Sequence, residues 1–462
     1  MHPFPTPGIK KREGGRIGGE LVRGHSAMKL KSSRGMTLQH RTGRRTQCVH
    51  SGAQRHNRSR LLVPFLVFLI CLCVPFTASA QENQERHERR RHAETAETEA
   101  DRIIQTAMTR KELPGLVLAV VCDGKTVVNK GYGVRSFESG EAPDADTVFY
   151  IGSLSKALTA VGAMLLVQRG KLDLDVPASA YLKHLPANWR NITVKQFLAH
   201  QSGIPQLNRK FPTFAQMLSS ARGVPLRFAP GTGQEYNNFN FAVVGKVIEA
   251  VSGMNYVNFM RRNVFGPLRM DHTGVKIVSR NVAISYRSAN GTRVPIEPRF
   301  KGGPYGIPSG HLQSTLSDVL KFYFALSSGR LLNPATYEQM VSRVHLGLSG
   351  TPGWFERRAG RFSLVSKNGA TQGFHSLMTF VSGRSDAVVL LWTSQKPGGK
   401  GLVRETNALL NQVCGVPLPR KAPASVKSSR GGVRGGTSYK KFLPDFTYLK
   451  AHWYQAVSEG PF

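Results

Sequence analysis

Apolar residues form short runs near both ends of the central part of the chain and recur at helical spacing between them. Two β-branched runs, Leu116–Cys122 and Thr126–Lys130, are joined by Asp123-Gly124. Because Asp-Gly tolerates the positive φ values of a tight turn, these segments predict a hairpin. Further strand patterns lie at 361–367, 377–381 and 387–393, and a closing helix is expected at 402–414.

Helical spacing dominates the region between these strands. From Ser153 to Gln168 the apolar residues recur once per helical turn, and Gly170 ends the pattern. Shorter helices are expected at 194–200, 239–251, 256–263 and 317–326. Strands at both ends with helices between them predict an α/β (α+β) fold, in which an antiparallel sheet is flanked by helices and accompanied by a mainly helical lobe.

Residues 1–80 are interpreted as an N-terminal extension that contains a signal sequence. The uncharged apolar run Leu61–Phe76 follows three arginines and precedes Ala78-Ser79-Ala80. The run is shorter than the about 18 residues expected of a spanning helix, so we expect cleavage after Ala80 and export to the periplasm or the outside of the cell. The alternative is an uncleaved segment, 61–80, that anchors the protein in the membrane.

The composition changes again at two further places. Residues 81–102 are nearly all polar, which predicts a solvated linker or the exposed start of a helix. Residues 415–462 are rich in Pro, Gly, Ser and Lys, and they are expected to form a basic, largely disordered tail. The folded domain is therefore predicted to span 103–414.

The chain carries 63 Lys+Arg and 28 Asp+Glu, a net charge of +35. Residues 1–80 contribute +12, 81–102 contribute −2 and 415–462 contribute +6, which leaves +19 on the predicted domain. This excess is diffuse and lacks a basic run interleaved with aromatic residues, so nucleic-acid binding is not expected. No Cys/His cluster has ligand spacing, so no metal or other cofactor is expected either.

Ser153-Leu154-Ser155-Lys156 places a serine at a helix start and a lysine one turn later on the same face. The lysine amine would be within reach of the serine oxygen, which needs a neighbouring base to become a nucleophile. The positive end of the helix would also favour the developing anion. The ordinary alternative is that Ser153 caps the helix and Lys156 is solvated.

Tyr236-Asn237-Asn238 lies where a loop changes into a helical pattern, so it would place a phenol beside an amide. The alternative is a half-buried core tyrosine followed by an asparagine cap. Lys367-Asn368-Gly369 ends a strand pattern, where a cation would hold a carboxylate and a glycine would let the backbone approach a substrate. The alternative for this lysine is a solvated strand edge.

Together and in this order, the three motifs resemble S-x-x-K, Y-x-N and K-T-G of the serine β-lactamase and penicillin-binding protein superfamily. With tyrosine at its head, the second motif resembles that of the branch formed by class C β-lactamases and D-Ala-D-Ala carboxypeptidases. This branch also contains esterases. The segments 198–205, 228–238 and 310–322 are similar to further family motifs. The resemblance covers roughly 103–414 and implies a β-lactamase/transpeptidase-like catalytic domain.

The resemblance implies a serine hydrolase that works through an acyl-enzyme. Ser153 Oγ would attack a carbonyl while Lys156 and Tyr236 exchange its proton, and either a neutral lysine or a tyrosinate would serve as the base. The backbone N–H groups of Ser153 and Ala370 would form the oxyanion hole. Asn238 would position the substrate amide.

Lys367, Asn368 and Gly369 would complete the substrate-binding site, with Lys367 holding a substrate carboxylate. The family commonly has Thr where this chain has Asn368, which can still donate a hydrogen bond but lacks the hydroxyl. Cys122 and Cys414 fall on elements that pack together in this fold, which leaves a disulfide as an option.

The substrate expected from the resemblance is a β-lactam or a D-Ala-D-Ala-type amide, supplied as a small molecule or derived from peptidoglycan. One alternative is an esterase that acts on small-molecule esters. Another is a catalytically inactive sensor that binds penicillin or peptidoglycan. The presence of Ser153, Lys156 and Tyr236 together favours an enzyme over the sensor.

Overall fold

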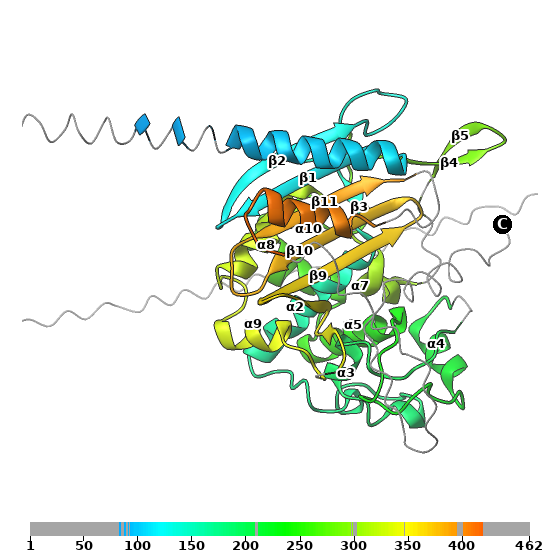
Figure 1. Ribbon diagram of the computed structural model, residues 1–462. Helices are drawn as coiled ribbons and strands as arrows, with labels where there is room; N and C mark the ends of the chain where they lie inside the picture. The colour runs from blue at the N-terminus through cyan, green and yellow to red at the C-terminus, as the bar shows by residue number, and fades with distance from the viewer. Residues whose placement is uncertain are drawn as a thin grey trace, which may run out of the picture. The chain divides into compact units, whose positions relative to one another are not determined.

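A computed structural model describes residues 83–84, 87–88, 91, 93–207, 211–296, 298, 303–345, 347–394 and 401–418. The predicted extension, 1–80, and residues 419–462 of the predicted tail lie outside the described residues. At the start of that tail, predicted from residue 415 onward, Val416 and Leu418 are buried in the core, so the predicted disorder is wrong there. The described part contains a large antiparallel sheet with helices packed on both faces and a mainly helical region (Figure 1). The predicted α/β (α+β) fold is therefore confirmed.

The large sheet has seven strands in the order β2-β1-β11-β10-β9-β8-β7, and all neighbours are antiparallel. Its strands are β1 (Gly115–Cys122), β2 (Lys125–Gly133), β7 (Gly350–Thr351), β8 (Trp354–Ala359), β9 (Phe362–Thr371), β10 (Phe374–Val381) and β11 (Ala387–Thr393). Two small sheets pair β3 (Phe149–Tyr150) with β6 (Gln313–Ser314) and β4 (Ser285–Ala289) with β5 (Thr292–Ile296).

The helices are α2 (Ser155–Gln168), α3 (Val194–Leu198), α4 (Phe214–Ala221), α5 (Asn238–Ser252), α6 (Tyr256–Met260), α7 (Ile307–Gly310), α8 (Leu316–Ser327), α9 (Pro334–Val341) and α10 (Val403–Gln412). Residues 93–111 are also helical. The 3₁₀ turn η1 (Gly152–Leu154) precedes α2, and a π-helical turn, Arg261–Phe265, continues α6. Further 3₁₀ turns lie at Ala178–Ala180, Ala187–Trp189 and Pro304–Gly306.

The hairpin predicted from Asp123-Gly124 joins β1 to β2. Asp123 and Gly124 have φ values of 47° and 76°, as a tight turn of this kind requires. β1 is buried along its whole length, which explains why its sequence is a continuous apolar run instead of an alternating one. β1 also pairs with β11, so the two ends of the domain share one sheet, as predicted.

One face of the sheet is covered by the helix 93–111 and by α10. Ala96, Ala100 and Leu409 from these helices share a buried core with Leu116 and Leu390 of the sheet. From residue 93 onward the segment 81–102 is the largely exposed start of a helix, as one of the two predicted options had it, with Ala96 and Ala100 buried. The other option, a solvated linker, is wrong there. Small alanines among charged residues form its buried positions, so hydropathy gives only a weak signal of them.

The other face of the sheet carries the larger core and the helical region. α2 lies within this core, because Ser155 through Leu166 are all buried. A helix that is apolar on every side is expected where protein surrounds it completely. This packing gives a rigid support to Ser153, which lies two residues before α2.

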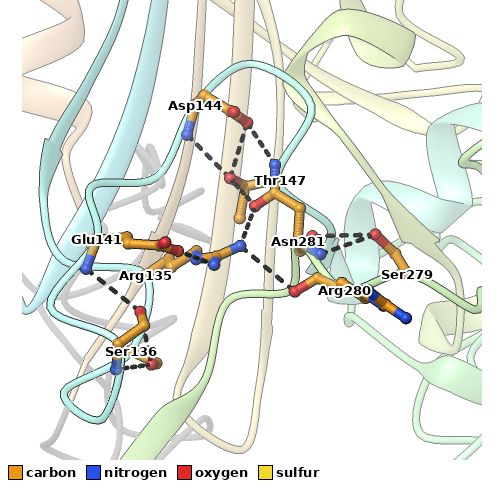
Figure 2. Close-up of polar contacts among 9 residues, drawn as sticks. Arg135, Ser136, Glu141, Asp144, Thr147, Ser279, Arg280 and Asn281 are labelled. Atoms are coloured by element: carbon orange, nitrogen blue, oxygen red, sulfur yellow. Dashed lines mark hydrogen bonds and ion pairs between the residues drawn. The ribbon is translucent and has the colours of Figure 1, made fainter.

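A polar network ties the chain leading into β3 to a distant loop, and Figure 2 shows this network around Asn281. Asn281 Oδ1 accepts a hydrogen bond from Arg135 at 3.0 Å and lies 2.7 Å from Thr147 Oγ1. Asn281 Nδ2 donates to Asp144 at 2.8 Å, and the Asn281 carbonyl accepts the N–H of Val148. The network fixes the start of β3, which runs on into η1.

Cys122 and Cys414 form a disulfide, the option that the sequence left open. Their Cα atoms are 5.1 Å apart, within the range that a disulfide spans. The bond joins the end of β1 to the chain just after α10, so it ties together two elements of the core on the α10 face.

Candidate active site

Ser153 lies in η1, and two side chains contact its hydroxyl. Ser153 Oγ is 2.5 Å from Tyr236 Oη and 3.1 Å from Lys156 Nζ. α2 begins two residues later, with Leu154 as its N-cap and without a side-chain capping bond. The alternative in which Ser153 caps the helix is therefore wrong.

Lys156 has an exposure of 0%, so the solvated alternative is wrong as well. Lys156 Nζ lies 2.8 Å from Asn238 Oδ1 and 2.5 Å from the carbonyl oxygen of Ser309. Burial, followed by the positive charge of Lys367, lowers the pKa of Lys156 well below its ordinary value. A neutral amine would donate its two N–H groups to these two oxygens and direct its lone pair at Ser153.

Tyr236 directly precedes the capping residue of α5 and presents its phenol to Ser153. Burial raises the pKa of Tyr236, and the hydrogen bond with Ser153 opposes this effect only in part. The phenol is therefore protonated at neutral pH. The asparagine cap of the alternative interpretation is present, but it is Asn237, whose Oδ1 accepts a backbone N–H of the first turn. Asn238 contacts Lys156 instead.

Lys367 lies on β9 with an exposure of only 1%, so the predicted alternative of a solvated strand edge is wrong. Its Nζ lies 4.8 Å from the ring centre of Phe355, 5.3 Å from that of Tyr236 and 5.9 Å from that of Phe241. Among the described residues Nζ has no hydrogen-bond partner. Burial lowers the pKa of Lys367 to about 7.

Gly369 shares the face of Lys367, whereas Asn368 lies on the opposite face of β9. Asn368 is exposed and pairs with Leu377, which belongs to the core on the α10 face. A Cβ atom at Gly369 would lie 2.0 Å from the carbonyl oxygen of Ile151, so glycine lets β9 approach η1 closely. The structure thus brings Gly369 into the site but not the Asn368 side chain.

The backbone of Ala370 lies against the residue before Ser153. Gly152 has a φ of 50°, and a Cβ atom there would lie 2.6 Å from the Ala370 nitrogen. β8 pairs with β9 only as far as Ser366, so β9 has no pairing with β8 from Lys367 onward. Ala370, one residue of the expected oxyanion hole, therefore lies against η1 beside Gly152, the residue before Ser153.

Sequence reasoning missed several groups that surround the motif residues. His200 packs its ring 4.5 Å from that of Tyr236, Phe355 covers Lys367, and the Ser309 carbonyl contacts Lys156. His200 lies in the segment 198–205, which resembles a family motif, but the resemblance assigned no function to this histidine. Phe355 and Ser309 gave no signal, because their partners are distant in sequence.

No group of three or more His, Cys, Asp or Glu side chains within the described part of the chain is placed to hold a metal ion. Over those same residues, no helix combines the length and the apolar character needed to cross a bilayer.

A comparison with known protein families identifies the family to which this site belongs. The family model described as Beta-lactamase matches residues 100–412. The chain belongs to the beta-lactamase family. Members of this family are generally serine hydrolases.

Two curated relatives of this beta-lactamase-family chain come from Staphylococcus aureus and Bacillus subtilis. Protein flp of Staphylococcus aureus strain N315 is 27% identical over 323 residues, which cover 64% of this chain and 63% of flp. The putative penicillin-binding protein PbpX of Bacillus subtilis strain 168 is 30% identical over 302 residues, which cover 63% of this chain and 74% of PbpX. The chain thus spans less than two thirds of the length of flp.

Solved structures share the fold of this family member. The octameric penicillin-binding protein homologue from Pyrococcus abyssi has a TM-score of 0.60 at 24% identity, covering 68% of this chain and 77% of its own. The D-alanine carboxypeptidase AmpC from Burkholderia cenocepacia has a TM-score of 0.60 at 22% identity, covering 69% of this chain and 99% of its own. Both confirm the β-lactamase/transpeptidase-like fold.

Proposed function

We propose that this protein is a serine acyl hydrolase that forms an acyl-enzyme on Ser153 with a β-lactam or a D-Ala-D-Ala-type amide. The observation that carries the proposal is the double contact of Ser153 Oγ with Lys156 Nζ and Tyr236 Oη. A hydroxyl becomes a nucleophile when a positioned base removes its proton. A sensor that only binds its ligand needs neither of these groups at the serine.

The pKa directions favour a neutral Lys156 over a tyrosinate as the base. Ser153 Oγ bonds to the carbonyl carbon and its proton passes to Lys156 Nζ, while the N–H groups of Ser153 and Ala370 stabilise the oxyanion. The carbon–nitrogen bond then breaks, and the leaving nitrogen takes a proton from Tyr236, which Lys156 resupplies. Water hydrolyses the ester by the reverse proton transfers. Asn238 positions the substrate amide.

Relatives and neighbours support an amide from the bacterial cell wall as substrate. One neighbour is described as a D-alanine carboxypeptidase and one relative as a putative penicillin-binding protein. Such substrates and β-lactams carry a carboxylate, which Lys367 would hold by a charge-assisted hydrogen bond. The substrate would be a small molecule or a peptidoglycan fragment.

Ester hydrolysis is the second candidate, and the enclosure of Lys367 favours it. With 1% exposure, this amine offers little surface to a carboxylate, and Asn368 points to the other face of β9. A matched pair of substrates, one with a free carboxylate and one with its methyl ester, separates the candidates. Lys367→Ala should cost about 1.5–3 kcal/mol on the carboxylate substrate alone if Lys367 holds it, and equally on both if it does not.

The acyl-enzyme is tested by labelling the protein with a fluorescent penicillin and with a p-nitrophenyl ester, followed by intact mass. We expect a stoichiometric mass increase that peptide mapping assigns to Ser153. Ser153→Ala is the matched control and should stay unlabelled. Labelling that persists in this variant, or that maps to another serine, contradicts the proposal.

We also propose that the protein is exported. The apolar segment 61–76 with its small residues at 78–80 supports this, and so does the disulfide of Cys122 and Cys414, because disulfides persist in oxidising compartments. N-terminal sequencing of the protein recovered from the periplasm or the medium should begin at Gln81. A membrane fraction that retains 61–80 would support the anchored alternative.

A further inference from the structure

We infer that His200 is the positioning residue for Tyr236, holding the phenol at Ser153; the inference rests on the proposed function of that site. His200 is 2% exposed and lies directly beneath the second motif. Its ring centre is 4.5 Å from that of Tyr236, so the two rings are in contact.

His200 holds the chain on both sides of Tyr236. Its carbonyl oxygen accepts the N–H of Glu235 at 3.0 Å. Its Nδ1 accepts the N–H of Asn237 at 3.2 Å. The two residues that flank Tyr236 are thus bonded to the same residue, and the ring between these bonds packs on the phenol. These bonds fix the backbone on both sides of Tyr236, and the ring contact restricts rotation of the phenol away from Ser153.

A hydrogen bond from Asn240 fixes the His200 ring itself. Asn240 Nδ2 lies 3.2 Å from His200 Nδ1, and Asn240 Oδ1 accepts a hydrogen bond from Ser202 at 2.7 Å. Because the backbone N–H of Asn237 donates to Nδ1, this nitrogen carries the lone pair and the ring proton lies on Nε2, which has no hydrogen-bond partner among the described residues. The ring is thereby held in one tautomer and one orientation.

The backbone at His200 has a left-handed conformation, which most side chains disfavour. α3 ends at Leu198, and His200 follows the C-cap with a φ of 58°. The N–H of His200 bonds to the carbonyl of Phe197 and the N–H of Gln201 to that of Gln196, as in a Schellman motif. Glycine or asparagine is usual at this left-handed position. A histidine there accepts backbone strain, and the contacts with the Tyr236 segment give it a role.

The inference is tested with two substitutions that suit the left-handed backbone. His200→Gly removes the ring and the acceptor, whereas His200→Asn keeps an oxygen near the position of Nδ1. For His200→Gly we expect the acylation rate of Ser153 to fall on the order of 10²-fold, as for misplacement of a catalytic group by about 1 Å. The acylation rate should fall less in His200→Asn than in His200→Gly. An equal fall in both variants would overturn the role of His200 Nδ1 as a hydrogen-bond acceptor.

A double-mutant cycle separates positioning from general support of the fold. The Tyr236→Phe protein is acylated slowly, and its acylation is followed by intact mass over hours. In this background His200→Gly should lower the acylation rate by less than about threefold. The same loss in both backgrounds would overturn the inference. If His200→Gly does not fold, the cycle is run with His200→Asn. The smaller fall in acylation rate that this variant causes must then disappear in the Tyr236→Phe background. His184, an exposed histidine with a similar φ of 66°, supplies the control variant His184→Gly, which should acylate normally.

A measurement that does not need activity keeps the two proposals distinguishable. Backbone amide exchange of the 235–238 segment reports whether His200 holds it. His200→Gly should accelerate this exchange at least about tenfold, and His184→Gly should leave it unchanged. Unchanged exchange in His200→Gly overturns the inference even if Ser153 is acylated. Absence of acylation in the unaltered protein contradicts the proposed function alone.

Discussion

The amine of Lys367 lies 4.8 Å from the ring centre of Phe355. The two residues come from neighbouring strands, since Phe355 on β8 pairs with Ser366, the residue before Lys367. A ring this close to an ammonium attracts it, but it also excludes the water that would solvate the charge. The loss of solvation outweighs the attraction of the ring, so the pKa of Lys367 drops to about 7.

The buried Lys367 should make the stability of the protein depend on pH. In the unfolded chain a lysine has a pKa of about 10.4. Between pH 7 and that value the unfolded state binds more protons than the folded state, so the free energy of unfolding should rise with pH. Lys367→Met should flatten this rise by on the order of 3–4 kcal/mol, measured by urea unfolding at several pH values.

The control for this prediction is Lys171→Met, which replaces an exposed lysine. This variant should keep the pH dependence of the unaltered protein. A Lys367→Met protein with an unchanged slope would show that the folded state keeps this amine charged.

The acylation rate should also depend on pH in a defined direction. The base is active when Lys156 is neutral, so the rate should fall as the pH drops through the pKa of this lysine. Because burial lowers that pKa well below its ordinary value, the rise should be complete far below pH 10. The raised pKa of Tyr236 places its own ionisation above about 10, the ordinary value, so a plateau should follow. A rate that rises only near pH 10 would contradict a neutral Lys156.

Local patterns made much of this molecule predictable. The hairpin at Asp123-Gly124 follows from two adjacent runs and a turn, and α2 follows from helical periodicity. Ser153 and Lys156 are one turn apart, so their contact was also expected from the sequence. In each case the interacting residues are near neighbours along the chain.

Contacts between distant parts of the chain were not predictable in this way. Lys156 bonds to a carbonyl at Ser309, and Phe355 and His200 approach the site only through the packing of β8 and α3. The strand β8, with the sequence WFERRA, carries three charged residues and resembles a loop by composition. Its place in the sheet comes from pairing with β9, a tertiary contact that hydropathy does not encode.

Gly369→Ala should separate β9 from η1. The added Cβ atom would lie 2.0 Å from the carbonyl oxygen of Ile151, so a backbone segment must move. We expect the acylation rate to fall on the order of 10²-fold and the unfolding free energy to drop by about 1–3 kcal/mol. Acylation kinetics and urea unfolding measure the two effects. The control is Gly401→Ala, where the nearest atom, of Val403, is 4.0 Å away and little should change. Normal acylation by Gly369→Ala would show that β9 does not need this close approach.

Loss of the disulfide should lower stability and spare the chemistry. Cys122 and Cys414 are 292 residues apart in sequence, so their bond restricts the unfolded chain strongly. The variant Cys122→Ala/Cys414→Ala should lose about 2–5 kcal/mol of unfolding free energy, and a reductant should destabilise the unaltered protein to a similar extent. Because Cys122 belongs to the core on the α10 face of the sheet, whereas Lys367 and Gly369 lie on the other, acylation of Ser153 below the melting temperature should be unchanged. Calorimetry in the presence and absence of reductant gives the first quantity and labelling kinetics gives the second. Equal melting temperatures under both conditions would show that the two thiols are not joined in the folded protein.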